Sequence, residues 1–144
     1  MISTTNINQA KEQIKKSKKP IIVKSQNNSF NRAILEYGRF DILLDIETTD
    51  ENRDKPKQLA SGLNHILAKA AAKNNISIGI DLETLSKLNK KAKAKRLAKI
   101  KQNIKLCRKA KCKLVLVNYK DKKDAQDILI SLGASSQQAK ESVN

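Results

Sequence analysis

The chain has 144 residues, 39% of them hydrophobic, and its 30 Lys and Arg against 14 Asp and Glu give a formal net charge of +16. This length predicts one domain, residues 1–144, with a hydrophobic core. So large a positive excess favours an acidic partner, most often nucleic acid. No apolar run reaches the ~18 residues of a membrane span, and residues 1–13 lack the apolar core of a secretory signal. We therefore expect a cytoplasmic protein without a membrane partner.

Metal-ligating side chains are scarce. The cysteines are Cys107 and Cys112, and His65 is the single histidine. A structural zinc site needs about four such ligands, so the composition argues against zinc and against a histidine-based hydrolase centre. We expect reduced thiols, with an adventitious disulfide as the alternative, and no cofactor.

Short apolar runs alternate with amphipathic stretches along the chain. Runs rich in β-branched residues predict buried strands at 20–24, 41–47, 76–82 and 113–118. Helices are predicted around them, with ends at Gly38, at Asn74 or Asn75, and at Gly133. A closing helix is expected from Ser135 or Ser136 as its N-cap. The apolar stripes of the other helices are Ile7, Ala10 and Ile14; Phe30, Ala33, Ile34 and Tyr37; Leu63, Ile66, Leu67, Ala70 and Ala71; Leu97, Ile100, Ile104 and Cys107; and Ile128, Leu129 and Leu132.

This alternation predicts an α/β fold in which parallel strands are joined by right-handed crossovers. Four strands do not close a barrel, so the options are a small doubly wound sheet or a partial TIM-barrel-like arc. The chain has only four glycines and no GxGxxG or GxxxxGK[ST] pattern. Dinucleotide-binding and P-loop functions are therefore excluded.

The strongest functional signal is a basic stretch from Thr84 to Lys120 without any acidic residue. Like charges four residues apart on a helix, such as Lys91 and Lys95, repel each other. A polyanion lying against the helix would offset this repulsion. The alternatives are a solvated face and an anionic membrane. The stretch holds fourteen basic residues: Lys87, Lys90, Lys91, Lys93, Lys95, Arg96, Lys99, Lys101, Lys105, Arg108, Lys109, Lys111, Lys113 and Lys120.

Aromatic residues are few, which bears on how a nucleic acid would be recognised. Only Phe30, Tyr37, Phe40 and Tyr119 are present, and there is no Trp. Single-strand binders stack bases on aromatic side chains. We therefore expect recognition of the backbone and shape of a folded RNA.

Three runs of the sequence together resemble a known family. They are SFNRAILEYGRFDILLDIE (29–47), SGLNHILAKAAAKNNISIGIDLETL (61–85) and RLAKIKQNIKLCRKAKCKLVLVN (96–118). The most telling pieces are Asn31-Arg32, the strand entry at 39–43 and Gly62-Leu63-Asn64-His65, and ILISLGASSQQAKESV (128–143) also fits. The set resembles ribonuclease P protein component 3, the thirty-kilodalton-subunit family of archaea and eukaryotes, over roughly residues 18–143.

The resemblance implies a TIM-barrel-like fold related to the polymerase-and-histidinol-phosphatase group. It implies a subunit that is not catalytic by itself, in a ribonucleoprotein endoribonuclease whose RNA removes the 5′ leader of precursor tRNA. The implied partners are RNase P RNA, precursor tRNA and other protein subunits, especially a small α/β subunit. Family members usually carry further β/α units before the strand at 20–24, so we expect a shortened N-terminus and an incomplete arc. We also expect the open sheet edges, not covered from within, to associate with a second copy or with the small partner.

Carboxylates at the expected strand ends offer a second, less favoured function. If Ile42, Leu44 and Ile46 face the helices, Asp45 and Glu47 point to the other side of the sheet. The same alternation places Asp81 there. Such carboxylates hold Mg²⁺ in a metal-dependent phosphodiesterase, or they are structural polar groups, which we favour. Another structural RNA-binding protein, for example of the ribosome, is the third alternative.

Candidate RNA contacts lie in several segments. His65 opens a helix, where it either binds phosphate or has a capping or packing role. Arg32 either clamps phosphate or pairs with Glu36 four residues on. The residues predicted to bind RNA are Arg32, Arg39, Arg53, Lys55, Lys57, His65, Lys87, Lys90, Lys91, Lys95, Arg96 and Lys99; no catalytic residue and no metal ligand is predicted.

Overall fold

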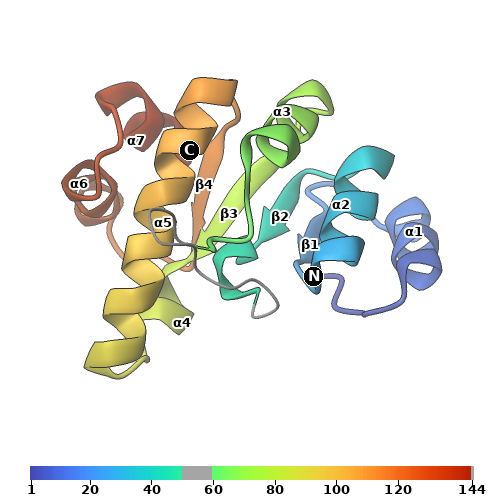
Figure 1. Cartoon of the computed structure of the whole chain (residues 1–144), viewed down its shortest axis with the longest axis horizontal. Helices are drawn as coiled ribbons and strands as arrows, with labels where there is room; N and C mark the ends of the chain where they lie inside the picture. Colours follow the sequence, from blue (N-terminus) through green and yellow to red (C-terminus); the bar gives the residue numbers. More distant parts are fainter. Residues whose placement is uncertain (50–59, 144) are drawn as a thin grey trace.

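A computed structural model describes residues 1–49 and 60–143. Its centre is a four-stranded parallel sheet in the order β1-β2-β3-β4 (Figure 1). The strands are β1 (Ile22–Lys24), β2 (Ile42–Leu44), β3 (Ser77–Asp81) and β4 (Leu114–Val117). The predicted alternation of parallel strands and helices is confirmed.

The helices follow the predicted stripes, with two short additions. Those anticipated are α1 (Ile7–Lys16), α2 (Asn28–Tyr37), α3 (His65–Lys73), α5 (Lys90–Ala110), α6 (Lys122–Ser131) and α7 (Ser136–Ser142). Of the two predicted N-caps, Ser135 and Ser136, the structure uses Ser135, which forms a reciprocal capping box with Gln138. The helix α4 (Leu82–Ser86) and the 3₁₀ turn η1 (Ile46–Thr48) directly follow strands and were not predicted. Within the described ranges, no helix is both long and apolar enough to cross a membrane.

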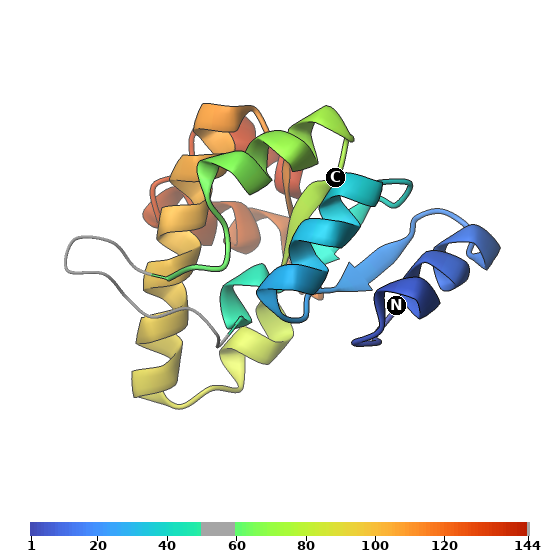
Figure 2. The same cartoon turned by 45° about the vertical axis from the view of Figure 1, so that its right-hand side comes forward.

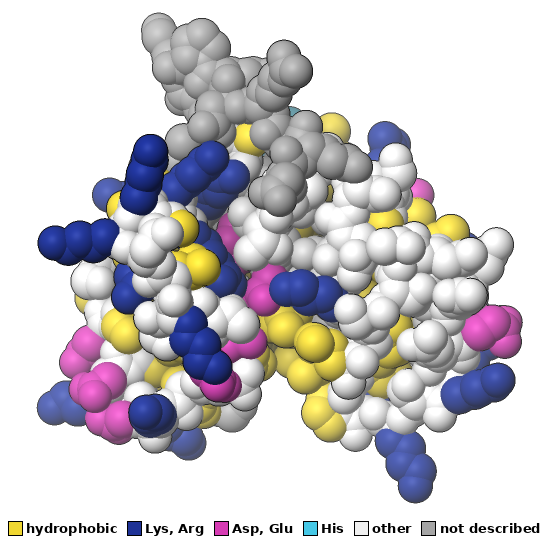
Figure 3. Space-filling model, turned by 90° about the horizontal axis from the view of Figure 1, so that it is seen from below, with side chains coloured by type: hydrophobic (Ala, Val, Ile, Leu, Met, Phe, Trp, Pro, Cys, Tyr) yellow, Lys and Arg dark blue, Asp and Glu magenta, His cyan; other side chains and the backbone are white. Residues whose placement is uncertain are grey.

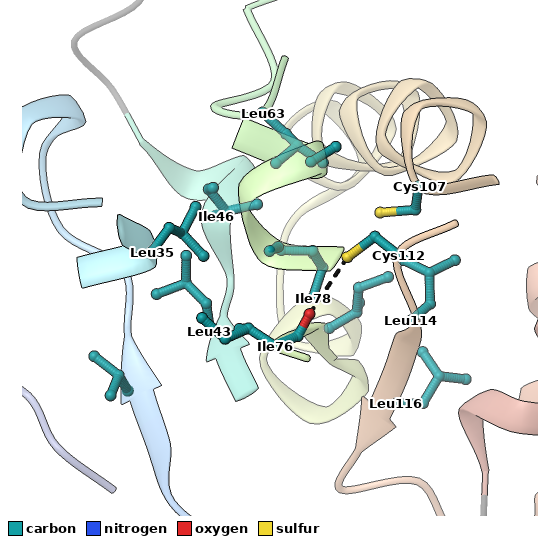
Figure 4. Close-up of a cluster of buried hydrophobic side chains, with 14 of the residues drawn as sticks. Leu35, Leu43, Ile46, Leu63, Ile76, Ile78, Cys107, Cys112, Leu114 and Leu116 are labelled. Carbon is teal, nitrogen blue, oxygen red and sulfur yellow. Dashed lines mark hydrogen bonds between the residues drawn. The ribbon is translucent and has the colours of Figure 1, made fainter. Parts of the chain in front are cut away.

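One face of the sheet is packed against helices. Val23, Leu43, Ile78 and Leu114 are aligned by the strand register and are at most 2% exposed. Figure 4 shows Leu35 of α2 and Cys107 of α5 among the side chains that cover this face, and Figures 1 and 2 show α2, α3 and α5 along it.

The opposite face is covered less completely. Ile22, Ile42 and Ser77 are aligned there and are only partly buried, as is Val115. Figure 3 shows hydrophobic side chains in the hollow at the middle of the molecule. A doubly wound sheet has helices on both faces, so this asymmetry fits the partial barrel-like arc.

The second strand departs from the predicted alternation. It ends at Leu44 because Asp45 has φ 61°, in the left-handed region, and η1 follows. Leu43 faces the helices, so the expectation for Ile42 and Leu44 was wrong by one residue. Gly79 accounts for this, since a Cβ there would lie 2.6 Å from Cγ2 of Ile42 and 3.0 Å from Cδ1 of Leu44. The two β2 side chains therefore fill the space that glycine leaves.

The outer edge of β1 is paired from within the chain. The Ile2 amide donates to the Ile22 carbonyl, and the Lys24 amide donates to the Ile2 carbonyl, both at 2.8 Å. The prediction of an uncovered edge was therefore wrong here. At the other edge α7 packs against β4, and Leu114 and Leu116 are each 2% exposed. Association with another chain stays a prediction.

Candidate nucleic-acid interface

Most of the acid-free stretch between residues 84 and 120 forms one long helix, α5. Its N-cap is Asn89, whose side chain accepts from the Ala92 amide at 2.9 Å. Its C-cap is Lys111, in the left-handed conformation. The 21 residues between the caps include no Asp or Glu.

The basic side chains of α5 are mostly exposed: Lys93 is partly buried, and Arg96 and Lys99 are buried. At 3.6 residues per turn, the exposed ones fall within an arc of roughly 140°. They are Lys90, Lys91, Lys95, Lys101, Lys105, Arg108 and Lys109, called the basic face below. Figure 3 looks at the end of the molecule where α5 begins, and Lys and Arg side chains gather around it.

The basic face has little internal neutralisation. Lys91 with Lys95, and Lys101 with Lys105, are like-charge pairs four residues apart, each costing a few tenths of a kcal/mol. Arg108 differs from these lysines because its side chain has a partner within the protein: Nη1 donates to the Gly133 carbonyl at 2.8 Å. A phosphate backbone is the kind of ligand that would neutralise such a surface.

Two basic residues of α5, Arg96 and Lys99, lie on its buried side. Arg96 is 8% exposed, and its Nη2 donates to Oδ1 of Asp45 at 2.9 Å and its Nε to Oε1 of Glu47 at 3.0 Å. Its Nη1 donates to Oγ1 of Thr84 at 3.1 Å. All three guanidinium nitrogens therefore have internal partners, an environment that does not favour the predicted contact of Arg96 with RNA. Lys99 is also 8% exposed, so its burial does not favour the predicted contact with RNA either.

The three carboxylates at the strand ends are used by these internal contacts. Asp45 accepts at Oδ2 from Nζ of Lys24 at 2.8 Å and at Oδ1 from the Asp81 amide at 3.1 Å, besides Arg96. Asp81 caps α4 by accepting from the Glu83 and Thr84 amides. Among residues 1–49 and 60–143, no group of three or more His, Cys, Asp or Glu is placed to hold a metal. The arrangement supports the structural alternative for these carboxylates.

Glu47 is the least satisfied of the three. Its Oε2 is buried without a hydrogen-bond partner among the described residues. Burial raises the pKa of the Glu47 carboxyl above its ordinary value, although the neighbouring Arg96 guanidinium lowers it. The cluster thus combines three ion pairs with one buried carboxylate oxygen, Oε2 of Glu47, that has no hydrogen-bond partner among the described residues.

The other predicted contacts lie at separate places on the surface. Arg32 pairs with Glu36 (Nε to Oε1, 3.2 Å), and Lys87 pairs with Glu83 (Nζ to Oε1, 3.0 Å). Arg39 lies over the Tyr37 ring, 5.5 Å from its centroid. These contacts do not test RNA binding. Arg53, Lys55 and Lys57 lie outside the described residues.

His65 is exposed as the first residue of α3, while Asn64 caps that helix by accepting from the Leu67 amide at 2.9 Å. The structure therefore gives the capping role to Asn64 rather than to His65. The predicted set did not include Lys101, Lys105, Arg108 and Lys109, although they belong to the same basic face. All four lie in the stretch from Thr84 to Lys120, whose lack of acidic residues could have indicated them.

The cysteines are buried free thiols. Sγ of Cys112 donates to the Ile76 carbonyl at 3.4 Å, the dashed line in Figure 4. The adjacent Cys112 thiol, together with burial, raises the pKa of Cys107. Both side chains belong to the hydrophobic core that positions α5 on the sheet.

Comparisons with known proteins confirm the resemblance to ribonuclease P protein component 3. That protein from Methanosarcina mazei is 40% identical over 96 residues, which cover 67% of this chain and 36% of the relative. The Methanosarcina acetivorans protein is 38% identical over 96 residues, with the same two shares. The Methanococcus maripaludis (strain C6) protein is 32% identical over 111 residues, covering 75% of this chain and 44% of the relative. No family model matches the sequence.

A solved structure extends the similarity to the fold. One chain of the cryo-EM structure of archaeal ribonuclease P with mature tRNA superposes with a TM-score of 0.73 and 25% sequence identity. The match covers 97% of this chain and 61% of that one. The matched segments span less than half the length of the curated relatives.

Proposed function

We propose that this relative of ribonuclease P protein component 3 is an RNA-binding protein subunit of ribonuclease P. In this role it supports the catalytic RNA in removing the 5′ leader of precursor tRNA and is not catalytic by itself. The similarity to the archaeal proteins and to the ribonuclease P chain supports the assignment. We further propose a cytoplasmic ribonucleoprotein containing other protein subunits, among them a small α/β partner.

The basic face of α5 is the observation that carries the RNA-binding part of the proposal. Its seven cations project from one rigid helix, whose buried side is fixed by Ile100, Ile104 and Cys107. Because the helix backbone is already ordered, contact with a phosphate backbone costs only the ordering of the lysine and arginine side chains. Each neutralised phosphate releases counterions, so binding should depend strongly on salt. Of the predicted contacts, we retain for this role Arg32, Arg39, His65, Lys87, Lys90, Lys91 and Lys95.

The salt dependence of binding tests this function. Affinity for the cognate RNase P RNA is measured from about 50 to 200 mM salt, and six or more phosphate contacts would weaken it about a thousandfold or more. A nearly flat dependence would contradict the proposal. Equal affinity for ribosomal RNA would favour a general structural RNA-binding protein instead.

Reconstitution tests the enzymatic context. Adding the protein to the RNase P RNA with its partner subunits should increase 5′-leader cleavage of precursor tRNA. The protein without RNA should cleave nothing, with or without Mg²⁺. Cleavage by the protein with Mg²⁺ alone would favour the phosphodiesterase alternative.

A further inference from the structure

A pocket of about 320 Å³ lies between α3 and the second half of α5. It is lined by His65 and Lys69 of α3 and by Leu106, Lys109 and Ala110 of α5. Three of these side chains carry basic nitrogens and two are apolar. The volume is within the range of small-ligand sites, so the pocket can take a group larger than a single ion.

Within residues 1–49 and 60–143, no acidic side chain pairs with the basic groups of this pocket. Neither α3 nor α5 contains an acidic residue, and in the described part of the chain His65, Lys69 and Lys109 make no hydrogen bond or ion pair through their side chains. By contrast, Arg32 of α2 and Lys87, the C-cap of α4, each pair with a glutamate four residues away. The pocket therefore offers positive charge that an anionic ligand can use.

We propose that this pocket binds a single nucleotide of the bound RNA, a proposal that rests on the proposed function. Lys69 and Lys109 would contact its phosphate, and the apolar surface of Leu106 and Ala110 would cover its base. A bare inorganic phosphate would leave that apolar surface unused, whereas a nucleotide joins an anion to a flat, weakly polar ring.

The position of the pocket favours RNA over an acidic peptide. Lys109 belongs both to the pocket and to the basic face, one helical turn after Lys105. A phosphate backbone that follows the exposed side of α5 would reach the pocket without leaving the basic face. One nucleotide turned toward α3 would then place its base on Leu106.

Nuclear magnetic resonance of the whole ¹⁵N-labelled protein tests the site with uridine 5′-monophosphate as the probe. We expect saturable amide shifts confined to α3 and the second half of α5. Inorganic phosphate and uridine, added separately, should each bind more weakly because each supplies half of the interaction. The double variant Lys69→Gln/Lys109→Gln should bind the nucleotide at least about tenfold more weakly, because it removes two charge-assisted contacts.

The matched control is Lys122→Gln/Lys123→Gln, which removes the same charge from exposed positions on α6. It should bind the nucleotide like the unmodified protein. The absence of saturable shifts at millimolar nucleotide, or an equal loss in both variants, would overturn the proposal. RNase P RNA binding is measured on the same samples: if it persists with its salt dependence while the nucleotide fails to bind, the pocket is refuted and the proposed function stands.

Discussion

Lys95 and Arg96 are neighbours in the sequence and on α5, yet their surroundings are opposite. Lys95 is exposed and belongs to the basic face. Arg96 is 8% exposed and is held by Asp45 and Glu47. The difference teaches that a basic run is not uniform in function: the side of the helix on which a cation lies decides whether it is available to a ligand.

The energetic reason is the cost of removing a charge from water. A buried cation loses several kcal/mol of hydration and needs carboxylates to compensate. An exposed cation keeps its hydration and remains available for exchange with a phosphate. We therefore expect variants of the two faces to change different properties, stability on the buried face and RNA affinity on the exposed one.

The largest effect is expected for Arg96→Ala. The change leaves Asp45 without one of its cations and Glu47 without its ion-pair partner, which should lower the free energy of unfolding by about 3–5 kcal/mol. Urea unfolding followed by circular dichroism measures this. Lys95→Ala is the matched control and should change stability by no more than about 0.5 kcal/mol. Equal losses in the two variants would show that burial does not separate the faces.

The second effect concerns the basic face alone. Lys101→Gln/Lys105→Gln/Lys109→Gln should make the slope of log affinity against log salt shallower by roughly 2 to 3, if each lysine contacts one phosphate. Stability should stay the same or rise slightly, because like-charge pairs are removed. Filter binding with RNase P RNA gives the slope, and an unchanged slope would place the RNA elsewhere.

A smaller loss of stability is expected at the N-cap of α5, the helix that carries both the basic face and the buried Arg96. Asn89→Ala removes the acceptor for the Ala92 amide and should cost about 1 kcal/mol of unfolding free energy. Asn89→Asp keeps an acceptor there and should be close to the original. RNA affinity should be similar in all three proteins well below their melting temperatures. A loss of stability with Asp as large as with Ala would argue against the cap.

The smallest effect is a pH dependence due to Glu47. Because burial raises its pKa in the folded protein above the ordinary 4.5, its folded form holds the proton more tightly than its unfolded form. The resulting stabilisation is fully present below pH 4.5 and is lost as the pH rises through the raised folded pKa. Glu47→Gln should remove this component, which unfolding experiments between about pH 4 and pH 7 can measure. A constant difference from the unmodified protein across that range would contradict it.

Sequence patterns predicted the elements whose signals are local. The strands, the length of α5 and the cap at Ser135 depend on residues close together in the chain. The carboxylate partners of Arg96 lie 49 and 51 residues away. The helical period places Arg96 one turn before Ile100 of the apolar stripe, but nothing near position 96 indicates which carboxylates hold it. The shift of Leu43 to the helix side depends on Gly79 of the neighbouring strand, and the pairing of Ile2 depends on β1. These features required the three-dimensional arrangement.

The Arg96 cluster also has a consequence for how related sequences diverge. Replacing Arg96 leaves Glu47 without its ion-pair partner, and replacing Asp45 or Glu47 removes one of the two carboxylates that hold Arg96. A lineage that loses one of the three therefore passes through a less stable protein. We expect the three positions to covary among relatives, changing together or not at all. The lysines of the basic face carry no such constraint. They should drift from one exposed position to the next, provided that the total charge of the face is maintained.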